Sequence, residues 1–343
     1  MKKLLALLLL LTLSLSVLTS CDLFKKDDDD KSTTTVKIGF MEGPTGMGMA
    51  KLISDYEKND RPEESKYQFV KYKDAKEATN ALIAGTVDLA CLPTNNAATI
   101  YNTKDGVAKV LAINCLNSLF LMTKTGTVLN SANDLEGKTI YTISNGTPKV
   151  ILEHALAEKG INATVSTTAT VGGKETALNQ PSDLASALIA GAVDIALVPE
   201  PVATAAPLNI TKQGKDYNYT VAFDFASVWA EISDTPVAMG CIVGRSSFVN
   251  ENKAAVDEFL NEYKASVEYI ANKDNLDTSA QLIVDATVLG AVPAAKKSLS
   301  NLLNAIAYKD GAEMETILKA FYGAINPNLI GGKLPDDNFY YQK

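Results

Sequence analysis

Two kinds of basic side chain are scarce in this 343-residue chain. It has one histidine, His154, and only two arginines, Arg61 and Arg245, among its 32 Lys and Arg residues. A single histidine excludes a His-rich metal site. The formal net charge of −8, with so little arginine, argues against a nucleic-acid partner. We therefore predict a protein with no metal, no other cofactor and no bound nucleic acid.

Catalytic signatures are also missing. The chain has no G-x-S-x-G, HExxH or P-loop motif and no paired His and Cys arrangement. Carboxylates are numerous, but no pair has a spacing that specifies acid–base chemistry. The four cysteines form no CxxC pair, and Cys91 and Cys241 lie in apolar segments, which favours buried small side chains over a disulfide. We do not expect an enzyme, although an enzyme on the fold argued below stays an alternative.

The N-terminus has the order of a bacterial lipoprotein signal. A basic start precedes a mostly apolar stretch at residues 4–18, and small residues then lead to Cys21. We predict a signal peptide over residues 1–20, lipidation of Cys21, and a polar tether over residues 21–35. A plain secretory signal, or a membrane helix before a buried cysteine, is the alternative. The predicted location is extracytoplasmic, on the cell membrane through the lipid anchor.

One thirteen-residue phrase occurs twice. Residues 81–93 are ALIAGTVDLACLP and residues 187–199 are ALIAGAVDIALVP, at an offset of 106. Each copy has the pattern of a helix end, a glycine, an aspartate in the turn and a short apolar strand closed by proline. Solenoid repeats recur every 20 to 50 residues and need at least three copies, so this spacing predicts two similar α/β lobes.

Strand and helix patterns alternate along the chain. Apolar segments at residues 36–41, 67–72 and 139–143 each precede a helical pattern, and the region from about residue 252 is mainly helical. This alternation favours sheets flanked by helices, and we assign the C-terminal region to packing on the first lobe.

Four loops each follow the end of a predicted strand and open a helix. They span residues 43–47, 94–96, 144–148 and 199–201. Ligands of open α/β sheets lie outside the carboxyl ends of strands, where backbone N–H groups at helix starts are free. The alternative is that the polar residues in these loops only cap helices. Convergence of all four loops would favour a pocket.

The chain resembles the substrate-binding proteins of ABC importers in the nitrate, sulfonate, taurine and thiamine-precursor group. The resemblance rests on the order of the lipid signal, VKIGF, GPTGMGMAKL, the two repeat copies, DLEGKTI, SNGTP and DIALVPEP. It implies a two-lobed periplasmic-binding-protein-like α/β fold. Each lobe is expected to hold a mixed, mostly parallel sheet flanked by helices, with two crossover strands between the lobes. The first lobe would comprise residues 36–118 and 245–343, and the second residues 119–244 including the crossovers.

The resemblance also implies a set of ligand-binding residues. They are Thr45, Gly46 and Met47, Asn95 and Asn96, Asn117 and Ser118 at the first crossover, Ser144, Asn145, Gly146 and Thr147, and then Glu200 and Trp229. From the residues alone, Glu200 could equally be a helix-start charge, and Trp229 could be a ligand-stacking ring or a ring that packs the lobes.

The candidate loops differ from nitrate- and sulfonate-binding members of the group, because they hold no arginine or histidine. This composition suits a partly apolar, hydrogen-bonding solute such as a heterocyclic vitamin precursor, with an organic sulfonate as the alternative. The implied function is capture of a small organic solute and its delivery to the permease and ATPase subunits of an importer, by a monomer. A lipid-anchored sensor or an adhesin stays the alternative function.

Overall fold

A computed structural model describes residues 35–57, 65–144 and 146–343, and Thr35–Lys343 forms one compact unit. The predicted signal peptide, the lipidated Cys21, almost all of the tether and Asn145 lie outside the described residues. Within the described ranges, no helix is both long enough and apolar enough to cross a bilayer.

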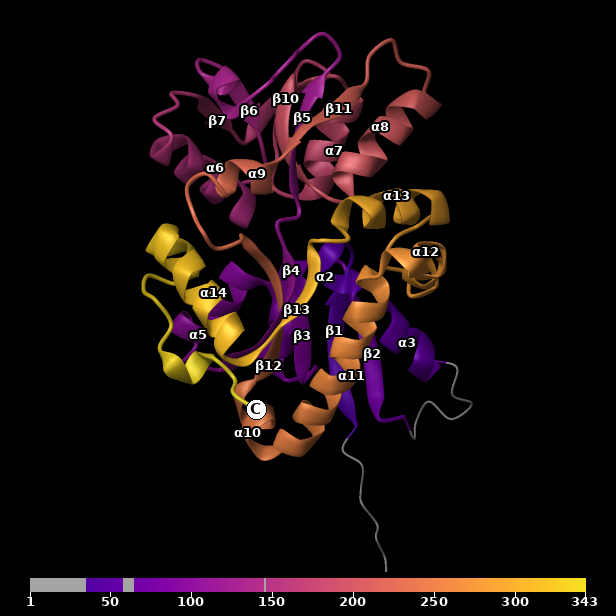
Figure 1. Cartoon of the computed structure of the whole chain (residues 1–343), viewed down its shortest axis with the longest axis vertical. Coiled ribbons are helices and arrows are strands. Elements are labelled where there is room, and N and C mark those ends of the chain that lie inside the picture. Colours follow the sequence, from indigo (N-terminus) through magenta and orange to yellow (C-terminus); the bar gives the residue numbers. More distant parts are fainter. Residues whose placement is uncertain (1–34, 58–64, 145) are drawn as a thin grey trace, which may run out of the picture. The chain divides into compact units, whose positions relative to one another are not determined.

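The first sheet has six strands in the order β13-β4-β12-β3-β1-β2 (Figure 1). Strand β1 pairs in parallel with both β2 and β3, whereas β12 runs antiparallel to β3 and β4. The strand bounds are β1 Val36–Met41, β2 Tyr67–Tyr72, β3 Leu89–Pro93, β4 Ala108–Leu116, β12 Ala238–Arg245 and β13 Ile306–Lys309.

The second sheet has five strands in the order β11-β5-β10-β6-β7. Strand β10 is parallel to β6 and antiparallel to β5, and β6 is parallel to β7. The bounds are β5 Leu119–Lys124, β6 Thr139–Tyr141, β7 Thr164–Ser166, β10 Ile195–Pro199 and β11 Tyr219–Asp224. A separate hairpin joins β8 (Thr168–Val171) to β9 (Lys174–Ala177). Two mixed sheets flanked by helices confirm the predicted fold class, but parallel pairs do not predominate in either sheet as expected.

The helices follow the strands of each sheet. Their bounds are α2 Pro44–Met47, α3 Ala50–Glu57, α4 Ala75–Ala84, α5 Thr94–Thr103, α6 Thr147–Glu158, α7 Pro181–Ile189, α8 Val202–Lys212 and α9 Phe225–Trp229; then α10 Ser246–Glu251, α11 Lys253–Ala271, α12 Leu276–Asp285, α13 Val292–Leu302 and α14 Gly311–Ala324. The helical pattern predicted after residues 36–41 forms two helices, α2 and α3, with Gly46 inside the first and Gly43 and Gly48 at its ends.

Two chain segments connect the sheets. The first runs from β4 through Asn117 and Ser118 directly into β5, and the second leads from α9 back to β12 (Figure 1). Strand β12 pairs within the six-stranded sheet, whereas the sequence-based division groups residues 236–244 with the second lobe and the crossovers. By its pairing β12 belongs with the first sheet, and the division into lobes remains a proposal.

The repeated phrase forms the same local structure twice. In the first copy, α4 ends at Gly85 (φ 72°) and β3 follows, and in the second, α7 is followed by Gly191 (φ 68°) and β10. A positive φ of this size is the region that glycine enters without steric cost. Each copy supplies one strand to one sheet, so the phrase is a building unit of both halves of the molecule.

The C-terminal helices do not pack on one sheet alone. Helices α11 and α12 contact α3, as predicted for the first lobe, and α13 packs on α12 but also on α8, which follows the second sheet's strand β10. Strand β13 also differs from the prediction, because the sequence pattern of the region from about residue 252 is mainly helical.

Candidate ligand-binding site

The loop after β1 is shaped by glycines. Gly43 has a φ of 92°, and α2 starts at Pro44 directly after it. A Cβ at Gly46 would lie 2.1 Å from the Met41 carbonyl oxygen, and one at Gly240 would lie 2.2 Å from Thr45 Cγ2. The backbone therefore turns so closely here that side chains are excluded at both glycines. Thr45, Gly46 and Met47 are buried as a result.

The loop after β3 meets the loop after β6. Asn95 and Thr147 each lie in the first turn of their helices, α5 and α6, and the Thr147 hydroxyl donates to Asn95 Oδ1 at 3.2 Å. Gly146 precedes this turn with a φ of 90°. This hydrogen bond joins two buried side chains on helices that follow strands of different sheets, so it holds the two helix starts together.

The remaining two loops also meet. A Cβ added at Gly43 would lie 3.8 Å from Pro201 Cδ and 3.9 Å from the Glu200 carbonyl oxygen. The Gly43 turn therefore lies beside the loop that follows β10, close enough for one added methyl group to touch it. With the contact between Asn95 and Thr147, the four loops converge in pairs, each pair with one member from each sheet.

Asn117 and Ser118 connect this region to the crossovers. Asn117 has a φ of 43°, its backbone N–H donates to the Val237 carbonyl at 3.0 Å, and its Oδ1 accepts from Val237 N at 2.9 Å. The Ser118 carbonyl accepts from Glu200 N at 3.3 Å. Asn117 thus uses its backbone and side chain to hold the second crossover, a role that the resemblance does not imply.

Glu200 is buried, with 1% of its surface exposed. Its carboxylate accepts from Thr204 Oγ1 at 2.9 Å, from Thr204 N at 3.3 Å and from Asn301 Nδ2 at 2.6 Å. Burial raises the pKa of Glu200, and these donors act against that rise. Asn301 on α13 is a partner that the sequence analysis missed, because nothing in the local pattern near residue 301 marks it.

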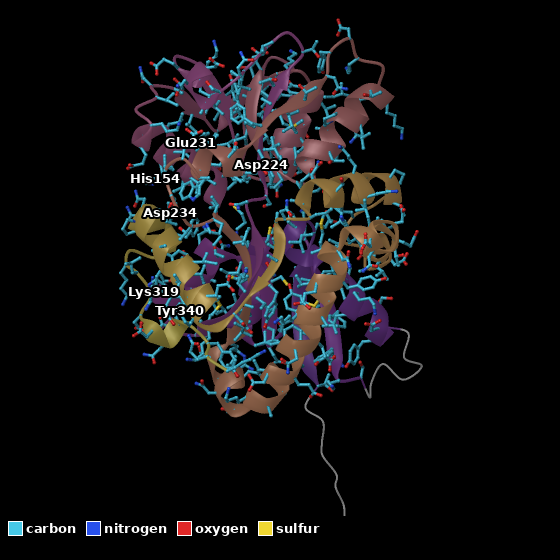
Figure 2. The ribbon with its side chains drawn as sticks, in the orientation of Figure 1. His154, Asp224, Glu231, Asp234, Lys319 and Tyr340 are labelled. Atoms are coloured by element: carbon cyan, nitrogen blue, oxygen red, sulfur yellow. The ribbon has the colours of Figure 1, made fainter. Side chains whose placement is uncertain are left out.

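Trp229 is a packing side chain in this structure, with 1% of its surface exposed. Its indole N–H donates to the Thr235 carbonyl at 2.8 Å, and its ring lies 5.6 Å from His154 and 6.4 Å from Phe321. Figure 2 labels His154, on α6. Of the two roles open to Trp229, packing between α6 and α14 is the one these contacts describe. Among the described residues of the predicted set, Ser144 is exposed and Asn96, Asn117 and Gly146 are half-buried.

The charge around the four loops is low. The nearest lysines are engaged elsewhere, since Lys51 pairs with Asp55 and Lys149 with Glu153 one helical turn away. Among the described residues, no group of three or more potential metal ligands is found. Thr45 Oγ1 is buried, and within the described part of the chain it has no hydrogen-bond partner. The loops therefore offer hydroxyl, amide and backbone groups with one buried carboxylate.

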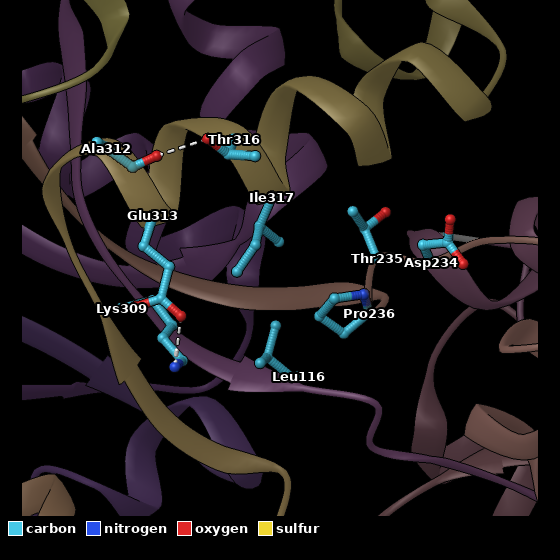
Figure 3. Close-up of a pocket in the computed structure, with 9 residues that line it drawn as sticks. All are labelled: Leu116, Asp234, Thr235, Pro236, Lys309, Ala312, Glu313, Thr316 and Ile317. Carbon is cyan, nitrogen blue, oxygen red and sulfur yellow. Dashed lines mark hydrogen bonds and ion pairs between the residues drawn. The ribbon is translucent and has the colours of Figure 1, made fainter.

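A surface pocket of about 560 Å³ lies at a different place, beside the second crossover (Figure 3). It is lined by Leu116, Asp234, Thr235, Pro236, Lys309, Ala312, Glu313, Thr316 and Ile317. None of the predicted ligand residues lines it. A narrower apolar space does include Asn117, together with Leu119, Ile151, Phe225, Ala226, Val237 and Met239, but it has no room for a water molecule.

Residues 66–275 match the family described as NMT1/THI5 like. This segment is more than half of the 343 residues, so the chain belongs to the NMT1/THI5-like family. No curated protein sequence matches the chain.

Several solved structures share the fold. An ABC transporter protein from Parabacteroides distasonis is 20% identical, with a TM-score of 0.69 over 90% of this chain and 99% of that one. The periplasmic aliphatic sulphonate binding protein SsuA from Escherichia coli is 18% identical, with a TM-score of 0.66 over 90% and 92%. The periplasmic nitrate-binding protein NrtA from Synechocystis PCC 6803 is 17% identical, with a TM-score of 0.55 over 82% and 74%. The resemblance predicted from the sequence is thereby confirmed.

Proposed function

We propose that this protein is the extracytoplasmic solute-binding component of an ABC importer, with its solute site at the four converging loops. The observation that carries the proposal is the pairing of loops from two sheets, with Thr147 bonded to Asn95 and Gly43 against Glu200 and Pro201. A solute that contacts both halves of such a site favours the state in which they are together. Delivery to permease and ATPase subunits follows from this role.

We further propose that the solute is a small, partly apolar organic molecule rich in hydrogen-bonding groups. Support comes from the side chains at the loops, which include the amides of Asn95 and Asn96, the hydroxyls of Thr45 and Thr147, and no basic group. A heterocyclic vitamin precursor fits these groups, and an organic sulfonate held by helix-start N–H groups is the other candidate. Lipidation of Cys21 would keep the monomeric protein at the membrane surface.

The first test is a solute screen. A binding solute at 100 times its Kd stabilises the folded chain by about 2.7 kcal/mol, which raises Tm by roughly 4 °C for a unit of this size. Small-angle scattering on the same samples follows the radius of gyration, and mass spectrometry of the purified protein identifies any small molecule that is carried along. Tight binding without a change in radius would contradict the closure, and the absence of any bound solute across the screen would contradict the function.

Replacement of Glu200 tests the chemistry of the site. We expect Glu200→Ala to weaken the binding of a cationic or N–H-rich solute about tenfold or more, because it removes a charged acceptor. Glu175→Gln, an exposed change on β9, is the control for the loss of one carboxylate. Unchanged affinity in a folded Glu200→Ala protein would assign Glu200 to structure alone.

A further inference from the structure

Glu200 is a buried carboxylate without a cation. Within the described residues it takes part in no ion pair; its oxygens accept from Thr204 and Asn301, and the neutral Ser298 hydroxyl on α13 also lowers its pKa. Burying a charge without an ion-pair partner costs free energy. Hydrogen bonds to the ionised carboxylate offset part of this cost, and they also fix the position of the side chain. The shortest of these bonds, 2.6 Å, comes from Asn301.

The two partners belong to different halves of the molecule. Glu200 follows β10 of the five-stranded sheet, and Asn301 lies in α13, which leads to β13 of the six-stranded sheet. Asn301 Nδ2 also lies 3.3 Å from Thr204 Oγ1, on the first turn of α8. Apolar residues of α8 and α13, among them Ala206 and Leu299, belong to the same buried cluster around this polar contact.

We infer that Asn301 is a cross-sheet positioning residue, whose amide donates to the Glu200 carboxylate and holds the end of β10 against α13. This contact is separate from the two crossovers, since it joins α8 and α13. Protein groups alone make this contact, so we expect it to hold the two halves together without a solute. A hydrogen bond to a charged group changes an equilibrium by about 10- to 150-fold.

Burial of Glu200 in the closed form makes closure sensitive to the charge of this carboxyl, and the bond from Asn301 acts against that effect. Burial raises the pKa of this carboxyl, so the closed form holds the proton more tightly than a form in which Glu200 meets water. Charged side chains on the neighbouring elements are exposed to solvent, which screens them; they are Lys296 and Lys297 on α13, Lys212 on α8 and Glu42 before the Gly43 turn. Lower pH therefore favours the closed form.

The test replaces the side-chain NH2 group of Asn301 with an oxygen atom. Asn301→Asp keeps the shape of the side chain but replaces the donor with a carboxylate opposite Glu200. We expect the ratio of open to closed molecules, without solute, to rise at least tenfold at pH 8 and to fall back as the pH drops towards 4, because one proton can then be shared by the two acids. Fluorescence energy transfer between dyes at Lys104→Cys and Lys215→Cys, both exposed positions, measures that ratio.

Two further variants test whether the effect comes from the contact between Asn301 and Glu200. Asn304→Asp makes the same change at an exposed asparagine three residues on, and it should leave the transfer efficiency unchanged at every pH. Glu200→Gln combined with Asn301→Asp exchanges amide and carboxylate, which restores a donor and an acceptor and should restore closure. If Asn301→Asp unfolds the chain, recovery in the double variant still supports the contact, and no recovery overturns it.

These measurements separate the positioning role of Asn301 from the solute-binding function. If Asn301→Asp and Asn304→Asp behave alike while solutes still compact the protein, the positioning role is wrong and the solute-binding function stands. If no solute binds but the unliganded protein opens in Asn301→Asp and recloses in the double variant, the positioning role stands alone.

Discussion

Residues 81–93 and 187–199 share a sequence pattern and a local structure, and the residues that follow them differ in chemistry. The first copy leads to Asn95, an amide bonded to Thr147, and the second leads to Glu200, a buried carboxylate bonded to Asn301. The comparison separates a scaffold, set by apolar packing and a glycine turn, from the loop beyond it. Because the two copies share the same scaffold, the loop after each copy can carry a different polar group.

The largest expected loss of stability comes from a core leucine that the two copies share, and it should be the same in both. Leu82 and Leu188 occupy matching positions and are 1% and 0% exposed. We expect Leu82→Ala and Leu188→Ala each to lower the free energy of unfolding by about 2–5 kcal/mol, because each leaves a cavity and loses buried area. Urea denaturation measures both. A large effect in one copy with almost none in the other would break the structural equivalence.

The aspartate of the phrase should distinguish the copies. Asp88 accepts from Lys37 N at 3.0 Å and pairs with Arg245 at 3.4 Å, whereas the Asp194 side chain is 74% exposed and lies 3.9 Å from Lys124. We expect Asp88→Ala to cost about 1–3 kcal/mol and Asp194→Ala less than about 0.5 kcal/mol. Equal losses in thermal or urea unfolding would show that the first aspartate has no special role.

The smallest effect is a pH dependence confined to the second copy's loop. Because burial raises the pKa of Glu200, the folded state binds this proton more tightly than the unfolded state, so the stabilisation is complete below the unfolded pKa of about 4.3. It is lost as the pH rises through the higher folded pKa. The wild type should therefore lose stability relative to Glu200→Gln as the pH increases from about 4. Glu158→Gln, at an exposed helix position, serves as the control, and parallel curves for both variants would contradict the expectation.

The sequence predicts the repeated units and the loops beyond them, because their signals are local. Helix ends, a glycine with positive φ and a short apolar strand are all encoded within thirteen residues. The hairpin of β8 and β9 also had a local signal, since Gly172 and Gly173, at φ 58° and 81°, form the kind of two-residue turn that connects antiparallel strands.

Tertiary partners could not be predicted in the same way. Asn301 lies 101 residues from Glu200, and only the packing of α13 on α8 brings them together. The role of Trp229 could not be predicted from the sequence either, because its neighbours His154 and Phe321 come from helices distant in the chain. In both cases the side chain alone allows a ligand role and a packing role, and the choice depends on what the fold places beside it.

Asn117 has a mechanical consequence for the whole molecule. Its backbone N–H and its side-chain oxygen both engage Val237, so the outgoing and returning connections between the sheets are fastened to each other at one point. Rotation of one sheet against the other must then bend both connections together about that point. A substitution at Asn117 would remove the bond to the Val237 N–H but leave the backbone bond to the Val237 carbonyl, so it would loosen this fastening without removing it.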